Sequence, residues 1–140
     1  MDWKEKLITE LKIETQSNQL NTGEKVINFF IDQFETTLAR PISLFDPNLV
    51  EIDKDSPNEV FLYVDEKSLH IRYSEVKGIA SITGGDFEVE ILVNKSGKTY
   101  LQTKDDLGQT VKRFVDESLV DEIWYCQYFC VNDFSTSQGR

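Results

Sequence analysis

Between Val60 and Thr103 the sequence alternates apolar and polar residues in five short runs. A period of two places apolar side chains on one face of a β-strand and polar side chains on the other. The breaks between the runs are rich in Gly, Ser, Asp and Lys, at the spacing of hairpin turns. This region therefore predicts a five-stranded antiparallel meander with one buried face, which helices from the rest of the chain must cover.

The turns can be tested against one another, because a slip of one residue moves every side chain of a strand to the other face. We expect loops at 65–68 and 74–77, a two-residue turn at Gly84 and Gly85, and a three-residue turn with a left-handed glycine at 95–97. All four turns bring apolar residues together on the same face. The expected pairs are Leu62 with Ile71, Ile71 with Ala80, Ala80 with Val89, and Ile91 with Leu101.

The other face of the predicted sheet is more apolar than a surface that only meets water. Leu92 is expected beside Tyr100 near one edge, with Glu88 and Glu90 around them, and Tyr63 lies near the other edge. Exposed tyrosines at a sheet edge often anchor protein interfaces. These five residues are therefore the candidate partner-binding residues. The alternative is that a helix covers part of this face, or that the aromatic residues are ordinary surface residues.

Two helices are expected before the meander, and both have apolar residues spaced by three and four. The first covers 2–14 at the surface. The second covers 23–39 and ends before Pro41, because proline disfavours helical angles in the preceding residue. From 41 to 59 we expect a crossing loop with a short edge strand at Leu49–Ile52. The apolar stripe of the first helix consists of Trp3, Leu7, Ile8 and Leu11.

After Lys104 the apolar residues return to helical spacing, which predicts a C-terminal helix packed on the sheet. Ser118 resembles an N-cap, so this helix is expected either to continue or to kink there. Residues 135–140 form a polar tail that we expect to be flexible. The apolar positions of the helix are Leu107, Val111, Phe114, Val115, Leu119, Ile123, Trp124, Tyr128 and Phe129.

The predicted fold class is therefore α+β, with two N-terminal helices, the meander and the C-terminal helix in one globular domain over residues 1–134. The chain has 140 residues, of which 39% are hydrophobic and 29% charged, as in an ordinary soluble domain. No apolar run approaches the length of a membrane span, and the N-terminus lacks the pattern of a signal peptide. We expect a cytoplasmic protein.

The formal net charge is −10, which disfavours direct binding to nucleic acid. Seven carboxylates and one lysine lie within 46–66, and four carboxylates lie within 116–122. Such runs keep a surface solvated, and they also suit docking of a basic partner, because opposite charges steer encounter.

The sequence carries no recognisable catalytic motif, such as a glycine-rich phosphate loop, a nucleophile elbow or a zinc-protease helix. The only histidine, His70, is expected on the outer face of a strand and cannot build a metal site alone. Cys126 and Cys130 share one face of a helix, which suits two reduced, buried thiols, with redox sensing as the alternative. We expect no metal and no cofactor.

Two classes of function follow. The first is a non-catalytic interaction or regulatory protein, such as an inhibitor, an immunity protein or a nucleic-acid mimic that meets a basic partner. The second is a small-ligand binder or an enzyme with a pocket between helix and sheet. Residues expected to line such a pocket are Tyr73, Phe87 and Trp124.

Overall fold

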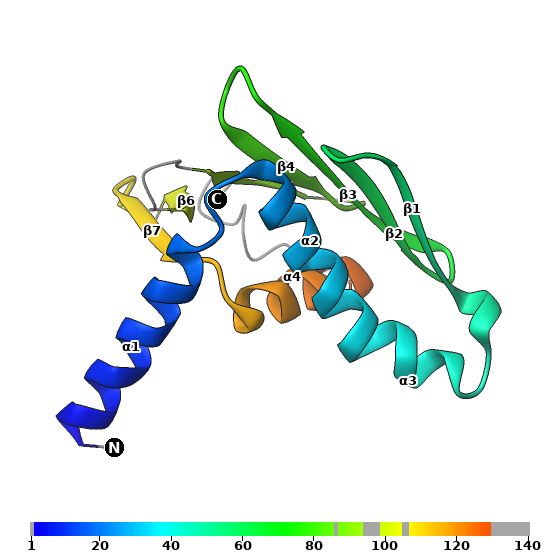
Figure 1. The fold of residues 1–140 in the computed structure, drawn as a ribbon, viewed down its shortest axis with the longest axis horizontal. Coiled ribbons are helices and arrows are strands. Elements are labelled where there is room, and N and C mark those ends of the chain that lie inside the picture. Colours follow the sequence, from blue (N-terminus) through cyan, green and yellow to red (C-terminus); the bar gives the residue numbers. More distant parts are fainter. Residues whose placement is uncertain (1, 86, 94–98, 105–106, 130–140) are drawn as a thin grey trace.

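The structure, a computed structural model, describes residues 2–85, 87–93, 99–104 and 107–129 of the chain, and it has an α+β fold with one antiparallel sheet (Figure 1). The helical elements are α1 (Trp3–Asn18), α2 (Gly23–Phe34), the π-helical turn η1 (Glu35–Ala39), α3 (Arg40–Ser43), the 3-10 turn η2 (Pro47–Leu49) and α4 (Glu117–Phe129). The strands are β1 (Val50–Ser56), β2 (Glu59–Val64), β3 (Lys67–Ser74), β4 (Ile79–Thr83), β5 (Glu88–Leu92), β6 (Tyr100–Lys104) and β7 (Thr110–Phe114).

The sheet has seven strands in the order of the sequence, so the predicted five-stranded meander gains one strand at each edge. β1 extends the expected short edge strand to Ser56. β7 replaces the first part of the predicted C-terminal helix, which begins only at Glu117. The apolar residues of that short segment are spaced as in a helix, but its backbone pairs with β6 along five residues, so it forms a strand.

The predicted register holds for β5 and β6, where Ile91 pairs with Leu101. The other three hairpins that we predicted are shifted by two residues, so that Leu62 pairs with Leu69 and Ala80 with Ile91. A shift of two leaves every side chain on its face, so the alternation alone could not detect it. The β2–β3 turn has only two residues, because Asp65 adopts a positive φ of 54°.

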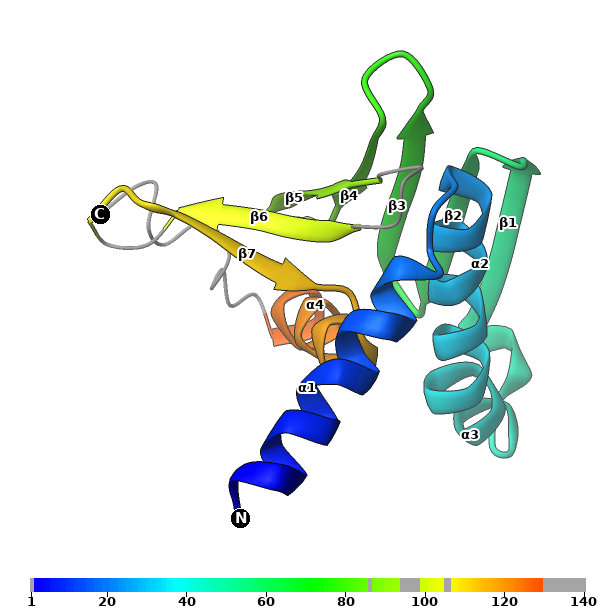
Figure 2. The ribbon, with the colours of Figure 1, turned by 60° about the vertical axis from the view of Figure 1, so that its left-hand side comes forward.

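The inner face of the sheet is buried as the alternation predicts, and α2 and α4 cover it (Figure 2). Burying these aliphatic side chains removes apolar surface from water, which is the main stabilising contribution to such a fold. The helices contribute Val26, Ile27, Phe30, Phe34, Leu119, Ile123 and Trp124 to this core. The strands contribute Val60, Leu62, Leu69, Ile71, Ala80, Ile82, Val89, Ile91 and Leu101.

The second predicted helix does not end before Pro41. Proline lacks the N–H of a regular helix, and its ring meets the carbonyl one turn earlier. The π-helical turn relieves this conflict, because the N–H of Arg40 bonds to the carbonyl of Glu35, five residues back, and the backbone widens there. Helical structure therefore continues through α3 to Ser43.

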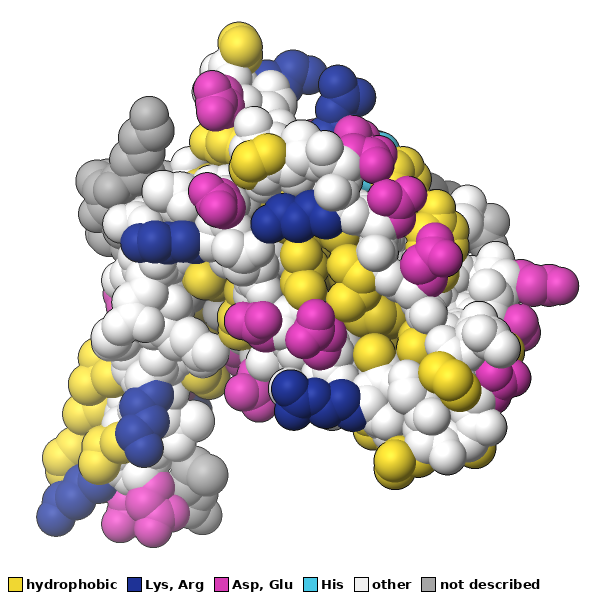
Figure 3. Space-filling view, turned by 45° about the vertical axis from the view of Figure 1, so that its right-hand side comes forward, with side chains coloured by type: hydrophobic (Ala, Val, Ile, Leu, Met, Phe, Trp, Pro, Cys, Tyr) yellow, Lys and Arg dark blue, Asp and Glu magenta, His cyan; other side chains and the backbone are white. Residues whose placement is uncertain are grey.

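The first helix is longer than predicted and continues through Ser17 to Asn18. Its N-terminal part extends away from the sheet and the other helices (Figure 1). On another side of the molecule, hydrophobic side chains reach the surface in a hollow among charged ones (Figure 3). Three predictions lie outside the described residues, namely the glycine turn at 95–97, the state of Cys130 and the flexible tail at 135–140.

Candidate binding groove

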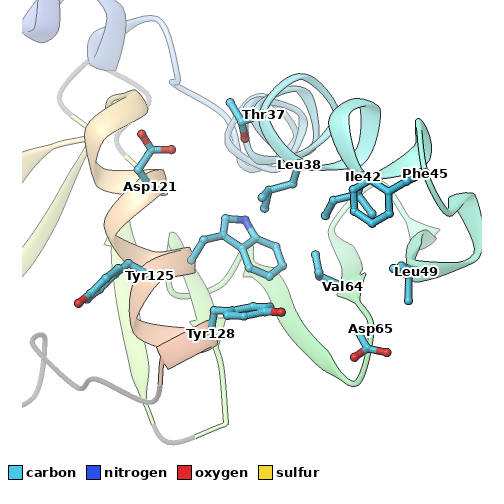
Figure 4. Close-up of a pocket in the computed structure, with 11 residues that line it drawn as sticks. Thr37, Leu38, Ile42, Phe45, Leu49, Val64, Asp65, Asp121, Tyr125 and Tyr128 are labelled. Carbon is cyan, nitrogen blue, oxygen red and sulfur yellow. The ribbon is translucent and has the colours of Figure 1, made fainter.

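A groove of about 580 Å³ opens between α3, η2, the end of β2 and one face of α4 (Figure 4). Its volume lies within the range of about 300–1,000 Å³ that is typical of ligand sites in proteins. Most of the side chains around it are apolar or aromatic. The lining residues are Thr37, Leu38, Ile42, Phe45, Leu49, Val64, Asp65, Asp121, Trp124, Tyr125 and Tyr128.

The wall formed by α3 and η2 is held by backbone hydrogen bonds. The N–H groups of Phe45 and Asp46 both donate to the carbonyl of Ile42, at 3.1 and 2.9 Å, and end the helical segment in a tight turn. The N–H of Asp65 donates to the carbonyl of Leu49 at 2.6 Å. This last bond connects η2 to the β2–β3 turn, so the wall is fixed relative to the sheet.

Trp124 of α4 lies at the boundary between the groove and the core. Its side chain is 6% exposed and stacks on Phe34 of α2, with ring centroids 5.4 Å apart. The indole Nε1 is buried and has no hydrogen-bond partner among the described residues. A buried N–H without a partner costs free energy, and a bound acceptor would recover it.

The rim of the groove combines exposed aromatic rings with two carboxylates. Phe45, Tyr125 and Tyr128 are between 50% and 75% exposed. Asp121 and Asp65 are also exposed and lie at opposite ends of the groove (Figure 4). No lysine or arginine occurs among the described residues that line it. Aromatic faces and carboxylates both attract cations, so the groove suits an apolar group that carries positive charge.

The candidate residues on the outer sheet face are only partly brought together. Leu92 pairs with Tyr100, as predicted, and both are half-buried. The Nζ of Lys112 lies 4.7 Å from the centroid of the Tyr100 ring. Glu88 and Glu90 point from the same strand as Leu92 and are exposed.

Tyr63 belongs to a separate cluster on β2 and β3. Its ring stacks on Phe61 at 6.2 Å, and Phe61 in turn stacks on His70 at 4.1 Å. The Nε2 atom of His70 lies 2.6 Å from a carboxylate oxygen of Glu59. β3 and β4 separate Tyr63 from Leu92, so the five candidate residues do not form one site.

The prediction of pocket residues from the sequence was only partly correct. Trp124 does line the groove, but Tyr73 packs against Gly23 at the start of α2, and Phe87 is buried beside Gly84. The alternation places residues on a face of the sheet, but it cannot say which end of that face stays open. The aromatic pair Tyr125 and Tyr128 and the exposed Phe45 were the available signals, and none of the three was predicted to line the pocket.

Other kinds of site receive no support from the residues that the structure describes. No three His, Cys, Asp or Glu side chains among them come together as they would around a metal ion. Cys126 is buried in the core, as expected of a small hydrophobic residue. Within these residues, no helix combines the length and the apolar character that crossing a membrane would need.

A comparison of this chain with protein-family models, curated proteins and solved structures found no match. Function has therefore to be argued from the geometry of the groove and from the charge of the surface.

Proposed function

We propose that this protein is a non-catalytic binding module whose groove accepts an amphipathic, positively charged segment of a partner protein. The observation that supports this proposal is the composition of the groove, in which three exposed aromatic side chains and several half-buried aliphatic ones lie between two carboxylates, without a cation among the described lining residues. Helix-in-groove recognition uses such a surface, because apolar side chains at helical spacing enter the groove while the charged flank stays at its rim.

The charge of the whole chain supports the same class of partner. A net charge of −10 attracts a basic segment over a distance of about 8–10 Å at physiological salt, and the carboxylates of the groove then orient it. The aromatic residues supply the affinity, since buried aromatic anchors dominate binding energy at interfaces.

A labelled peptide with leucine and lysine at amphipathic helical spacing tests this proposal by fluorescence anisotropy. The wild-type protein should bind it more weakly as salt rises, and it should bind the matched peptide with glutamate for lysine at least tenfold more weakly. The double variant Asp65→Asn, Asp121→Asn should lose affinity for the lysine peptide, because it removes both carboxylates of the rim.

Glu88→Gln with Glu90→Gln is the matched control, because both residues are exposed and the change in charge is the same. Unchanged binding by this control locates the peptide in the groove. If the control loses affinity and the groove variant does not, the outer sheet face is the binding surface. Equal binding of the two peptides would contradict a preference for basic partners.

A small ligand is the second candidate, and the buried Nε1 of Trp124 favours it. A compact aromatic amine with a hydrogen-bond acceptor would fill the groove, accept a bond from this N–H and place its ammonium group near a carboxylate. Binding to the native state raises the melting temperature by mass action. A thermal-shift screen of aromatic amines against the corresponding carboxylic acids therefore tests this alternative, and Trp124→Phe should reduce the shift.

A further inference from the structure

The last two turns of α4 lie between two cavities. Trp124, Tyr125 and Tyr128 line the groove described above (Figure 4). Cys126 and Gln127 point to the opposite side of the helix and line a second cavity of about 460 Å³, beside the β2–β3 and β4–β5 turns. A displacement of this part of α4 would therefore change the shape of the groove.

The side chain of Gln127 connects α4 to both of these turns. Its Oε1 accepts a hydrogen bond of 2.7 Å from the N–H of Gly85, and its Nε2 donates one of 2.6 Å to the carbonyl of Ser68. The amide is thus bonded at both ends, and the residue is only 6% exposed. Such bonds are costly to break, because each break leaves a buried polar group without a partner.

The surroundings of Gln127 hold it in the same place. The Nζ of Lys67 donates to the backbone carbonyl of Gln127 at 3.3 Å. A Cβ atom built at Gly84 would lie 2.7 Å from Oε1 of Gln127, so only a glycine lets the β4–β5 turn come this close to the side chain. The start of β3, the β4–β5 turn and α4 therefore meet at one amide group.

The polar contacts at the other end of α4 are local in the sequence. The carboxylate of Asp116 accepts a bond of 2.8 Å from the N–H of Leu119, and Arg113 forms an ion pair with Glu122. These contacts join the start of the helix to the residues just before it. They do not fix where the last two turns lie relative to β3 and the β4–β5 turn, which is what the bonds of Gln127 do.

We propose that Gln127 is a positioning residue of the groove: its two side-chain hydrogen bonds fix the last two turns of α4 against the sheet and so hold Trp124 and Tyr128 in the groove wall. Gln127 itself lines the second cavity and not the groove, so its effect on binding is indirect. Where it concerns affinity, this inference rests on the proposed function. Without the two bonds, the apparent affinity should fall to the fraction of molecules that keep the groove in shape.

The variant Gln127→Leu removes both bonds and keeps a side chain of similar size. Hydrogen exchange of the Gly85 amide, measured by NMR, should become about tenfold faster, because this amide then opens without breaking a bond. Acrylamide should quench Trp124 more strongly in a Trp3→Phe background. Gln19→Leu is the matched control, since Gln19 is exposed, and it should change neither quantity. Far-UV circular dichroism and the melting temperature verify that each variant is folded at the temperature of measurement.

Binding of the leucine–lysine peptide measures the consequence for function. Gln127→Leu should bind it roughly tenfold more weakly, as expected if about one molecule in ten keeps the groove in shape. Its dependence on salt should remain that of the wild type, because Asp65 and Asp121 are unchanged. An altered salt dependence would mean that the substitution acts through charge, which contradicts a positioning role.

The variant Gln127→Glu adds a measurement that a general loss of stability would not move. Its carboxylate can accept from the N–H of Gly85 but has no proton to donate to the carbonyl of Ser68, whereas the protonated carboxyl can do both. Burial favours the protonated form. Affinity and Trp124 quenching, each relative to the wild type at the same pH, should therefore return toward the wild-type values as pH falls from about 7 to about 5.

Two results would overturn the inference: unchanged Gly85 exchange in Gln127→Leu, or faster exchange with unchanged quenching of Trp124. If Gln127→Leu does not fold, the comparison of pH values within Gln127→Glu decides, and a defect that persists at low pH counts against the inference. If exchange and quenching respond as expected but the peptide binds equally well, or does not bind the wild type at all, the proposed function is wrong and the position assigned to Gln127 stands.

Discussion

Ser17 and Thr99 lie 82 residues apart in the sequence and share one buried hydrogen-bond cluster. The hydroxyl of Ser17 donates to the carbonyl of Thr99 and accepts a bond of 3.0 Å from the N–H of Val115. The hydroxyl of Thr99 donates to the carbonyl of Leu20 at 2.5 Å. The last turn of α1 is thereby connected to the start of β6 and to the segment that links β7 to α4, and Ser17 anchors the helix there.

Ser17→Ala should therefore destabilise the protein by about 2 kcal/mol or more, because it leaves two buried backbone groups without their partner. Urea unfolding followed by circular dichroism measures the change. Thr15→Ala in the same helix is the control, since Thr15 is exposed, and it should cost under about 0.5 kcal/mol. Equal midpoints for the two variants would show that the cluster contributes nothing to stability.

Gly23→Ala should also destabilise the fold. A Cβ atom built at Gly23 would lie 2.1 Å from the nearest ring carbon of Tyr73, so the start of α2 and β3 could not approach each other as they do. Overpacking of this kind costs about 1–3 kcal/mol. The double variant Gly23→Ala, Tyr73→Leu should recover part of the loss in thermal unfolding, because it shortens the clashing side chain. Additive losses would place the cause elsewhere.

Asp53 and Asp55 point to the same side of β1, and the charge of Asp55 raises the pKa of the Asp53 carboxyl above its ordinary value. A raised pKa in the folded state means that the folded protein binds this proton more tightly than the unfolded chain. Stability should thus fall slightly as pH rises through the titration of Asp53. An NMR titration of the side-chain carboxyl should show the shift, and Asp55→Asn should lower the pKa. An unchanged pKa in this variant would contradict the assigned cause.

The two tryptophans should report different environments, since Trp3 is 70% exposed and Trp124 is 6% exposed. In dilute solution, acrylamide should quench the fluorescence of the Trp124→Phe variant several-fold more strongly than that of Trp3→Phe. Efficient quenching of both would mean that Trp124 is not buried against Phe34 and the core. Weak quenching of Trp3 in dilute protein would mean that the apolar stripe of α1 is covered within a single chain.

The sequence by itself determined the faces of the sheet and the helical stripes. Both follow from local periodicity, because a strand repeats every two residues and a helix every 3.6. The alternation therefore identified the buried set from Val60 to Leu101, and the spacing of Trp3, Leu7 and Leu11 identified the stripe of α1. Periodicity does not encode register in steps of two, so three hairpins were displaced without a change of face.

The tertiary structure decided what those local patterns contact. β7 is a strand because the edge of β6 offers backbone partners, although its apolar spacing also suits a helix. The π-helical turn before Pro41 carries the chain into α3 and so shapes one wall of the groove. Whether the stripe of α1 is covered depends on the direction in which the helix leaves the cluster around Ser17, and that direction arises from contacts between residues far apart in the chain. Local sequence specifies which face of a helix or strand is apolar. What that face contacts is set by the packing of segments that lie far apart in the chain.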